Sequence, residues 1–314
     1  MKWTSVSYLL LLLLQSPEAA PEQDELTITH EGKPISSLTR EAHRLPVFPL
    51  LDMGRYERWM DELDRITYRE ATNARINSSG KIDPGQNGYK LNRKEFLKAY
   101  YEYMYSSGST TIELPTYPVY PRVDTELLAS LRSKQIGYYI TYYNSGNADR
   151  SYNIALAAKA IDGTVVFPGE TFSFNQVVGI RTTDKGYKRA GVIVRGEMSE
   201  GVGGGICQVS STLFNAVDRA GLKVVQRYSH SRHVSYVPPG RDATVSWGGP
   251  DFVFDNEYNQ PILIRAFAGG GSMVVNIFSS DVIEYSPKKI PSMSDRLPEE
   301  MKDIRIQPEP VSGR

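Results

Sequence analysis

The chain has 314 residues, enough for about two domains with at least one buried core. Its 36 basic and 36 acidic residues cancel, which excludes the general attraction of a basic protein to nucleic acid, so we expect no nucleic-acid partner. A hydrophobic content of 40% with 20 tyrosines excludes a mainly disordered chain.

The N-terminal segment, residues 1–20, has the order of a secretory signal. Lys2 precedes an apolar run centred on residues 9–14, and small and polar residues follow it. The run is too short to span a bilayer comfortably, so we expect export and an extracytoplasmic location. Ala19 and Ala20 form a poor cleavage site, and an uncut membrane tether is the alternative.

A polar linker is predicted over residues 21–45, followed by a small helical N-terminal domain over residues 46–123. Apolar residues at helical spacing predict one amphipathic helix over residues 56–74. A second helix is expected to begin at Leu91, with Asn92 as its cap.

A strand-rich C-terminal domain is predicted over residues 124–285. Residues 111–114 are typical of an edge strand, and prolines after them predict an extended linker up to the boundary near Val123. One helix is predicted at residues 207–220, and the charged, proline-containing residues 286–314 predict a disordered tail. The expected strands are residues 136–143, 222–227, 234–237, 243–247, 252–254, 262–267 and 273–278. We therefore expect an α+β protein whose C-terminal domain carries one cysteine-bearing helix.

The strongest local pattern is GGGICQVS at residues 203–210, which places the single cysteine, Cys207, in the first turn of a helix. The free N–H groups and positive potential there stabilise a thiolate. Gly204 and Gly205 leave the backbone open to hold an oxyanion, and Gln208 lies beside them as a candidate substrate contact. A lone cysteine is also often a small buried hydrophobic residue, and spacing alone leaves both interpretations open.

A thiolate nucleophile needs an imidazole partner, and the chain has four histidines. His230 and His233 lie at a turn between two predicted strands, where a side chain can reach another element. His30 and His43 lie in a weakly patterned stretch and are expected to be solvated. The alternative for His230 and His233 is an ordinary surface position in a loop.

Two carboxylates, Asp242 and Asp251, are candidates for orienting the imidazole, and spacing does not choose between them. Arg241 is a candidate for binding a substrate carboxylate through a bidentate pair. Its alternative role is an ion pair with Asp242 or another neighbour that locks the turn at residues 238–242.

Zinc is the one metal that the residue types suggest, with Cys207, His230 and His233 as a mixed ligand set. No second cysteine or H-E-x-x-H pattern supports such a site, and the chain contains no G-x-x-x-x-G-K-[ST] phosphate loop. We therefore expect no cofactor.

Several ordered blocks of the C-terminal half match one known family. They are YNIALAA at 152–158, FPGETFSFN at 167–175, GGGICQVSSTLFNA at 203–216 and VSYVPPGRDATV at 234–245. On these blocks the chain resembles the VanW family over residues 127–281, and so many ordered matches are improbable by chance. The preceding stretch, chiefly residues 88–97, is similar to the peptidoglycan-binding-like module that often precedes VanW domains.

The resemblance implies a cell-wall protein, and some domains of the family are associated with L,D-transpeptidase activity. Carried over by position, Cys207 is the nucleophile and His230, on the family's histidine-serine pair, its base; His233 is the alternative base. Asp242 is our prediction for the third catalytic residue, a choice that spacing alone does not make. The implied function is cysteine-dependent acyl transfer on peptidoglycan stem peptides. The alternatives are a non-catalytic peptidoglycan-binding or glycopeptide-resistance accessory protein, and a cysteine peptidase acting on peptidoglycan.

Overall fold

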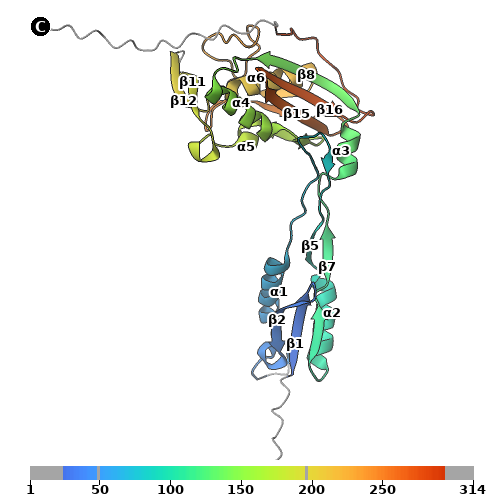
Figure 1. Ribbon diagram of the computed structural model, residues 1–314. Coiled ribbons are helices and arrows are strands. Elements are labelled where there is room, and N and C mark those ends of the chain that lie inside the picture. The colour runs from blue at the N-terminus through green and yellow to red at the C-terminus, as the bar shows by residue number, and fades with distance from the viewer. Residues whose placement is uncertain (1–23, 48–49, 195–196, 294–314) are drawn as a thin grey trace, which may run out of the picture. The chain divides into compact units, whose positions relative to one another are not determined.

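The computed structural model describes residues 24–47, 50–194 and 197–293 (Figure 1). The predicted signal or anchor lies outside these residues. The described part forms two compact units, the first holding the residues up to Thr72 and Gln86–Arg122, the second holding Asn73–Gly85 and the residues from Val123 onward. Helices and strands occur in both units, so the predicted α+β class is confirmed. None of the described helices is long and apolar enough to cross a bilayer.

The first unit contains a small sheet in the order β2 (Lys33–Thr39), β1 (Glu25–His30), β6 (Thr110–Glu113). The central strand β1 is antiparallel to β2 and parallel to β6, so the edge position predicted for residues 111–114 is observed. Leu26 and Ile28 alternate along β1 and are fully buried. The linker predicted over residues 21–45 is therefore wrong for this stretch, because the polar and apolar residues of β1 alternate with a period of two and β2 pairs with it.

Two helices complete the hydrophobic core of the first unit. The elements are η1 (Arg40–His43), α1 (Met53–Thr67), β5 (Gly88–Leu91), α2 (Arg93–Tyr105) and β7 (Thr116–Val119). Asn92 caps α2 as predicted, its side-chain oxygen accepting the N–H of Glu95 at 3.1 Å. His43 is buried, and its Nδ1 lies 3.0 Å from the hydroxyl of Tyr100, so the expectation that it is solvated is wrong.

The second unit is built on a four-stranded antiparallel sheet in the order β8 (Lys134–Tyr142), β16 (Ser272–Ser279), β15 (Ile262–Gly269), β9 (Val165–Val166). Helices α4 (Ala148–Ile161) and α6 (Ile206–Arg219) pack against this sheet and each other (Figure 1). The apolar stripe of α6, with Leu213 and Val217, shares its core with Ile264 and Val275 of the sheet. The helix that carries the cysteine is thus held by the largest core of the chain.

Shorter elements surround that core. They are β3 (Arg75–Ile76), β4 (Ile82–Asp83), α3 (Thr125–Leu131), β10 (Thr171–Ser173), α5 (Phe174–Val178), η2 (Thr183–Lys185), β11 (Arg189–Val194), β12 (Glu197–Val202), β13 (Lys223–Gln226) and β14 (Val253–Asp255). Strand β14 lies between β10 and β13 in a second sheet. The β11–β12 hairpin leads directly into the glycine run before α6.

Two predicted strands, residues 234–237 and 243–247, are irregular in the structure. Val234, Val237, Ala243 and Val245 are buried, but the two segments join no sheet because turns bracket Pro238 and Pro239. Part of the predicted tail is also ordered, since the N–H of Lys288 donates to the carbonyl of Arg219 at 3.0 Å.

Candidate active site

Three glycines shape the loop that enters α6. Gly203 and Gly205 have φ values of 87° and 104°, which side-chain-bearing residues rarely adopt. A Cβ at Gly204 would lie 2.6 Å from the carbonyl carbon of Ala190, so only glycine lets this loop pass so close to β11. The glycine run therefore fixes where α6 begins, and with it the position of the next side chain.

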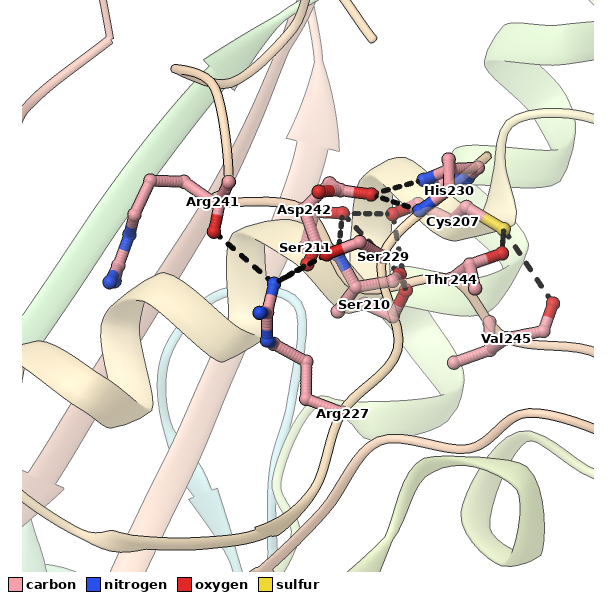
Figure 2. Close-up of polar contacts among 12 residues, drawn as sticks. Cys207, Ser210, Ser211, Arg227, Ser229, His230, Arg241, Asp242, Thr244 and Val245 are labelled. Carbon is pink, nitrogen blue, oxygen red and sulfur yellow. Dashed lines mark hydrogen bonds and ion pairs between the residues drawn. The ribbon is translucent and has the colours of Figure 1, made fainter. Parts of the chain in front are cut away.

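Cys207 lies in the first turn of α6 and is partly exposed. Its Sγ lies 3.7 Å from Oγ1 of Thr244 and 3.6 Å from the carbonyl oxygen of Val245 (Figure 2). One side of the residue also packs against the hydrophobic core. The sulfur thus has polar partners on one side and apolar cover on the other.

His230 lies between the sulfur and a carboxylate (Figure 2). Its ring hydrogen-bonds to Cys207, and its Nδ1 lies 2.6 Å from Oδ2 of Asp242. The same carboxylate oxygen accepts the backbone N–H of His230 at 2.6 Å. Because Asp242 holds Nδ1, the other ring nitrogen, Nε2, is the one available to the sulfur.

The charges of these three groups are coupled. Burial raises the pKa of the Cys207 thiol, but hydrogen bonding and the charge of His230 outweigh it and place that pKa below its ordinary value. Burial lowers the pKa of His230, whereas its contacts with Asp242 and Cys207 raise it to about 9. For Asp242, burial raises the pKa, but the hydrogen bonds from His230 lower it by more, so the pKa of this carboxyl lies below its ordinary value. The contacts therefore favour the charged form of each group: a thiolate, an imidazolium and a carboxylate in a row.

Hydrogen bonds tie the segment around Asp242 to the cysteine-bearing helix. The hydroxyl of Ser211 accepts the N–H of Ala243 at 2.8 Å and donates to the carbonyl of Cys207 at 2.7 Å. Arg227 donates to the carbonyl of Asp242 at 2.7 Å (Figure 2). These contacts hold the carboxylate and the sulfur on opposite sides of the imidazole although the two residues come from separate segments.

Other candidate residues have different partners. Asp251 accepts the hydroxyl of Ser173 at 2.6 Å and so lies at the start of α5 rather than at the imidazole. Arg241 pairs with Asp218 at 2.8 Å, and its side chain points away from the sulfur (Figure 2). Of the two roles considered for Arg241, the ion pair that locks the turn matches these contacts.

Two further candidates also lie apart from the sulfur. Gln208 is buried, donates to the carbonyl of Tyr142 at 3.0 Å and accepts from Arg150 at 2.8 Å. His233 is exposed at a cavity of about 210 Å³, whose lining includes His230 but not Cys207. Gln208 therefore supports α6 from within, and of the two downstream histidines only His230 contacts the sulfur.

The described residues contain no group of three histidine, cysteine, aspartate or glutamate side chains that could hold a metal ion. The mixed zinc set of Cys207, His230 and His233 is therefore not assembled in residues 24–47, 50–194 and 197–293.

Sequence reasoning missed four neighbours of the sulfur. Thr244 and Val245 lie in a segment that was predicted as a strand, although their place directly after Asp242 in a family block was a usable signal. Tyr236, whose pKa burial raises, faces Cys207 and hydrogen-bonds to Ser211. Arg181 faces Cys207 from the loop between α5 and η2, and no pattern in the sequence marks it.

The second unit is an α+β domain built around a cysteine–histidine–aspartate site, and its residues place it in a known family. Residues 149–278 match the family described as VanW like protein. The chain is 57% identical to the protein YoaR of Bacillus subtilis (strain 168) over 293 residues, which are 93% of this chain and 96% of that protein. The chain belongs to the VanW family.

A second relative is more distant. The vancomycin B-type resistance protein VanW of Enterococcus faecalis (strain ATCC 700802 / V583) is 34% identical over 114 residues, which are 35% of this chain and 42% of that protein. No solved structure matches the chain. The family match includes all three residues of the site and begins after the first unit, where the peptidoglycan-binding-like module stays a prediction.

Proposed function

We propose that the chain is an exported cell-wall protein that uses Cys207 for acyl transfer on peptidoglycan stem peptides, in the manner of an L,D-transpeptidase. The observation that supports this most is the row formed by the side chains of Cys207, a partly exposed residue, His230 and Asp242. A reactive thiolate needs a positive neighbour, and a general acid must lie within reach of the leaving group. His230 meets both requirements in one side chain.

In the first half-reaction the thiolate of Cys207 attacks the carbonyl at the L-centre of the third residue of a donor tetrapeptide. Backbone N–H groups at the start of α6 are the donors that we expect to stabilise the oxyanion. The bond to D-alanine breaks, and the imidazolium of His230 gives its proton to the departing amine. The product is a thioester on Cys207 and free D-alanine.

In the second half-reaction an amine of a neighbouring stem attacks the thioester. Neutral His230 takes the proton of that amine, and Asp242 keeps the imidazole oriented and stabilises its charge. The cross-link forms and the thiolate returns. Water in place of the amine would make the same site a peptidase.

The cellular setting rests on two separate supports. The signal-like pattern of residues 1–20 favours export to the wall. The Enterococcus faecalis relative is named for vancomycin B-type resistance, which favours a role in a wall exposed to glycopeptides. Stem peptides are present both at the site of export and in a wall exposed to glycopeptides, so they are the substrate that we propose.

The test uses the purified full chain with disaccharide-tetrapeptide muropeptides and mass spectrometry of the products. Cross-linked dimers and free D-alanine are expected from the unmodified chain and neither from Cys207→Ala. Arg189→Met, which changes an exposed residue of β11, serves as the active control. Dimers from Cys207→Ala reject the role of the thiol; tripeptides without dimers assign the peptidase; binding without any product assigns the non-catalytic protein.

A further inference from the structure

Arg181 carries a buried guanidinium whose two terminal nitrogens have no hydrogen-bond partner among the described residues. The residue lies in the loop between α5 and η2. By contrast, Arg241 of this unit forms an ion pair with Asp218, and Arg265 forms one with Asp162. An unpaired buried cation costs several kcal/mol unless a ligand supplies the missing charge.

The side chain of Arg181 runs along the loop that leads to the cysteine. A Cβ placed on Gly203 would lie 3.4 Å from its Cβ and 3.6 Å from its Cγ. The guanidinium lies 5.7 Å from the ring centroid of Phe174, which covers one side of it. The glycine run thus leaves room for this arginine beside the start of α6.

The negative groups that face this guanidinium leave it unneutralised. Burial lowers the pKa of Arg181, and Tyr187, Cys207 and Asp251 oppose that effect. The tyrosine is neutral, because burial raises its pKa, and the carboxylate of Asp251 accepts N–H groups and a hydroxyl at the start of α5. The thiolate of Cys207 is shared with His230. The two unpaired terminal nitrogens of this planar guanidinium match the two oxygens of a carboxylate.

We propose that Arg181 binds a free carboxylate of the substrate next to the bond that Cys207 attacks. This rests on the acyl transfer proposed above and specifies its donor. In a tetrapeptide the carboxylate nearest to the attacked carbonyl belongs to the D-alanine that leaves, one residue beyond the scissile bond. Arg181 therefore selects stems that end one residue after the attacked carbonyl, and rejects stems that are amidated or blocked there.

Binding tests this without relying on turnover. Isothermal titration of a tetrapeptide and its C-terminal amide is carried out on the full-length Cys207→Ala chain and on the same chain with Arg181→Met or Arg181→Lys. The Cys207→Ala chain is expected to bind the acid about tenfold or more tightly than the amide, since charge-assisted hydrogen bonds are lost with the amide. Arg181→Met should abolish this ratio, and Arg181→Lys should keep part of it.

The outcomes separate this inference from the proposed function. If the unmodified chain makes no thioester but Arg181→Met still abolishes the acid preference, acyl transfer fails and the carboxylate site stands. The carboxylate site is wrong if the chain with Arg181→Met still binds the acid more tightly than the amide. It is also wrong if the Cys207→Ala chain, which keeps Arg181, binds neither peptide. A higher pKa of Cys207 in Arg181→Met with an unchanged acid preference would assign the arginine to the thiolate and overturn the inference as well. The unfolding midpoint of Arg181→Met checks that the variant folds.

Discussion

Oδ2 of Asp242 lies 2.6 Å from both the ring Nδ1 and the backbone nitrogen of His230. One carboxylate oxygen thus fixes the ring and the main chain of the same residue. The side chains of His230 and Asp242 are only 6% and 9% exposed, so water screens this interaction weakly. The charge state of Cys207 depends on this contact, because His230 is the group that lowers the pKa of its thiol.

Asp242→Asn is expected to lower the pKa of His230 from about 9 toward or below its ordinary value of about 6.5. The reason is that the burial of the ring, which lowers the pKa, remains while the carboxylate that raises it is removed. The chain has only four histidines, so an NMR titration resolves them, with His230→Gln giving the assignment. Asp251→Asn, whose carboxylate lies at α5, is the control and should leave the value near 9. An unchanged pKa in Asp242→Asn would contradict the assigned contact.

The rate of alkylation of Cys207 by iodoacetamide should rise with pH through a midpoint below the ordinary pKa of a cysteine thiol. The sign follows from the lowered pKa: the thiolate is already present at pH values where a free cysteine is mostly protonated. His230→Gln removes the positive neighbour but not the burial, so the midpoint should move upward. His233→Gln leaves the sulfur's contacts intact and should not move it. Equal midpoints in the unmodified chain and His230→Gln would show that the imidazole does not act on the sulfur.

The helix carrying the cysteine was predictable because its signals are local. A glycine run comes before it and Gly221 after it, and the observed helix, Ile206–Arg219, differs from the predicted residues 207–220 by one position at each end. The first strands are marked more weakly, because only Leu26 and Ile28 form the apolar face of β1 and the apolar residues of β2, Ile35 and Leu38, are three positions apart. Local pattern thus located the helix that carries Cys207 but not every element around it.

The choice between Asp242 and Asp251 could not be made from the sequence. Both follow a turn, and what separates them is the hydrogen bonding of Ala243 to Ser211, which links residues 32 positions apart. No sequence pattern marks Arg181, because what distinguishes it is that the terminal nitrogens of its guanidinium have no hydrogen-bond partner among the described residues. Such relations exist only once the chain has folded.

Arg241→Met should destabilise the second unit by about 1–3 kcal/mol without changing the alkylation midpoint of Cys207. The substitution removes the ion pair with Asp218, both side chains being less than a fifth exposed, and the hydrogen bond to Oδ1 of Asn215 at 2.7 Å. Arg189→Met breaks an exposed pair with Glu200 and should change the free energy of unfolding by less than about 0.5 kcal/mol. Urea unfolding of both variants measures this. If Arg241→Met leaves the free energy of unfolding unchanged but abolishes peptide binding, Arg241 binds the substrate and does not lock the turn.

Gly205→Ala should be more destabilising than Gly163→Ala, although both glycines have positive φ values, 104° and 80°. Forcing alanine into this conformation costs about 1–2 kcal/mol at either position. At Gly163 the added methyl meets no atom within 4 Å, whereas at Gly205 it would lie 2.9 Å from Cγ1 of Ile154, which is fully buried and has no room to move. The crowding adds about 1–3 kcal/mol at Gly205 only. The difference between the two urea midpoints measures this term, and equal midpoints would mean that the glycine is needed for its φ value and not for the close approach of α4 to the start of α6.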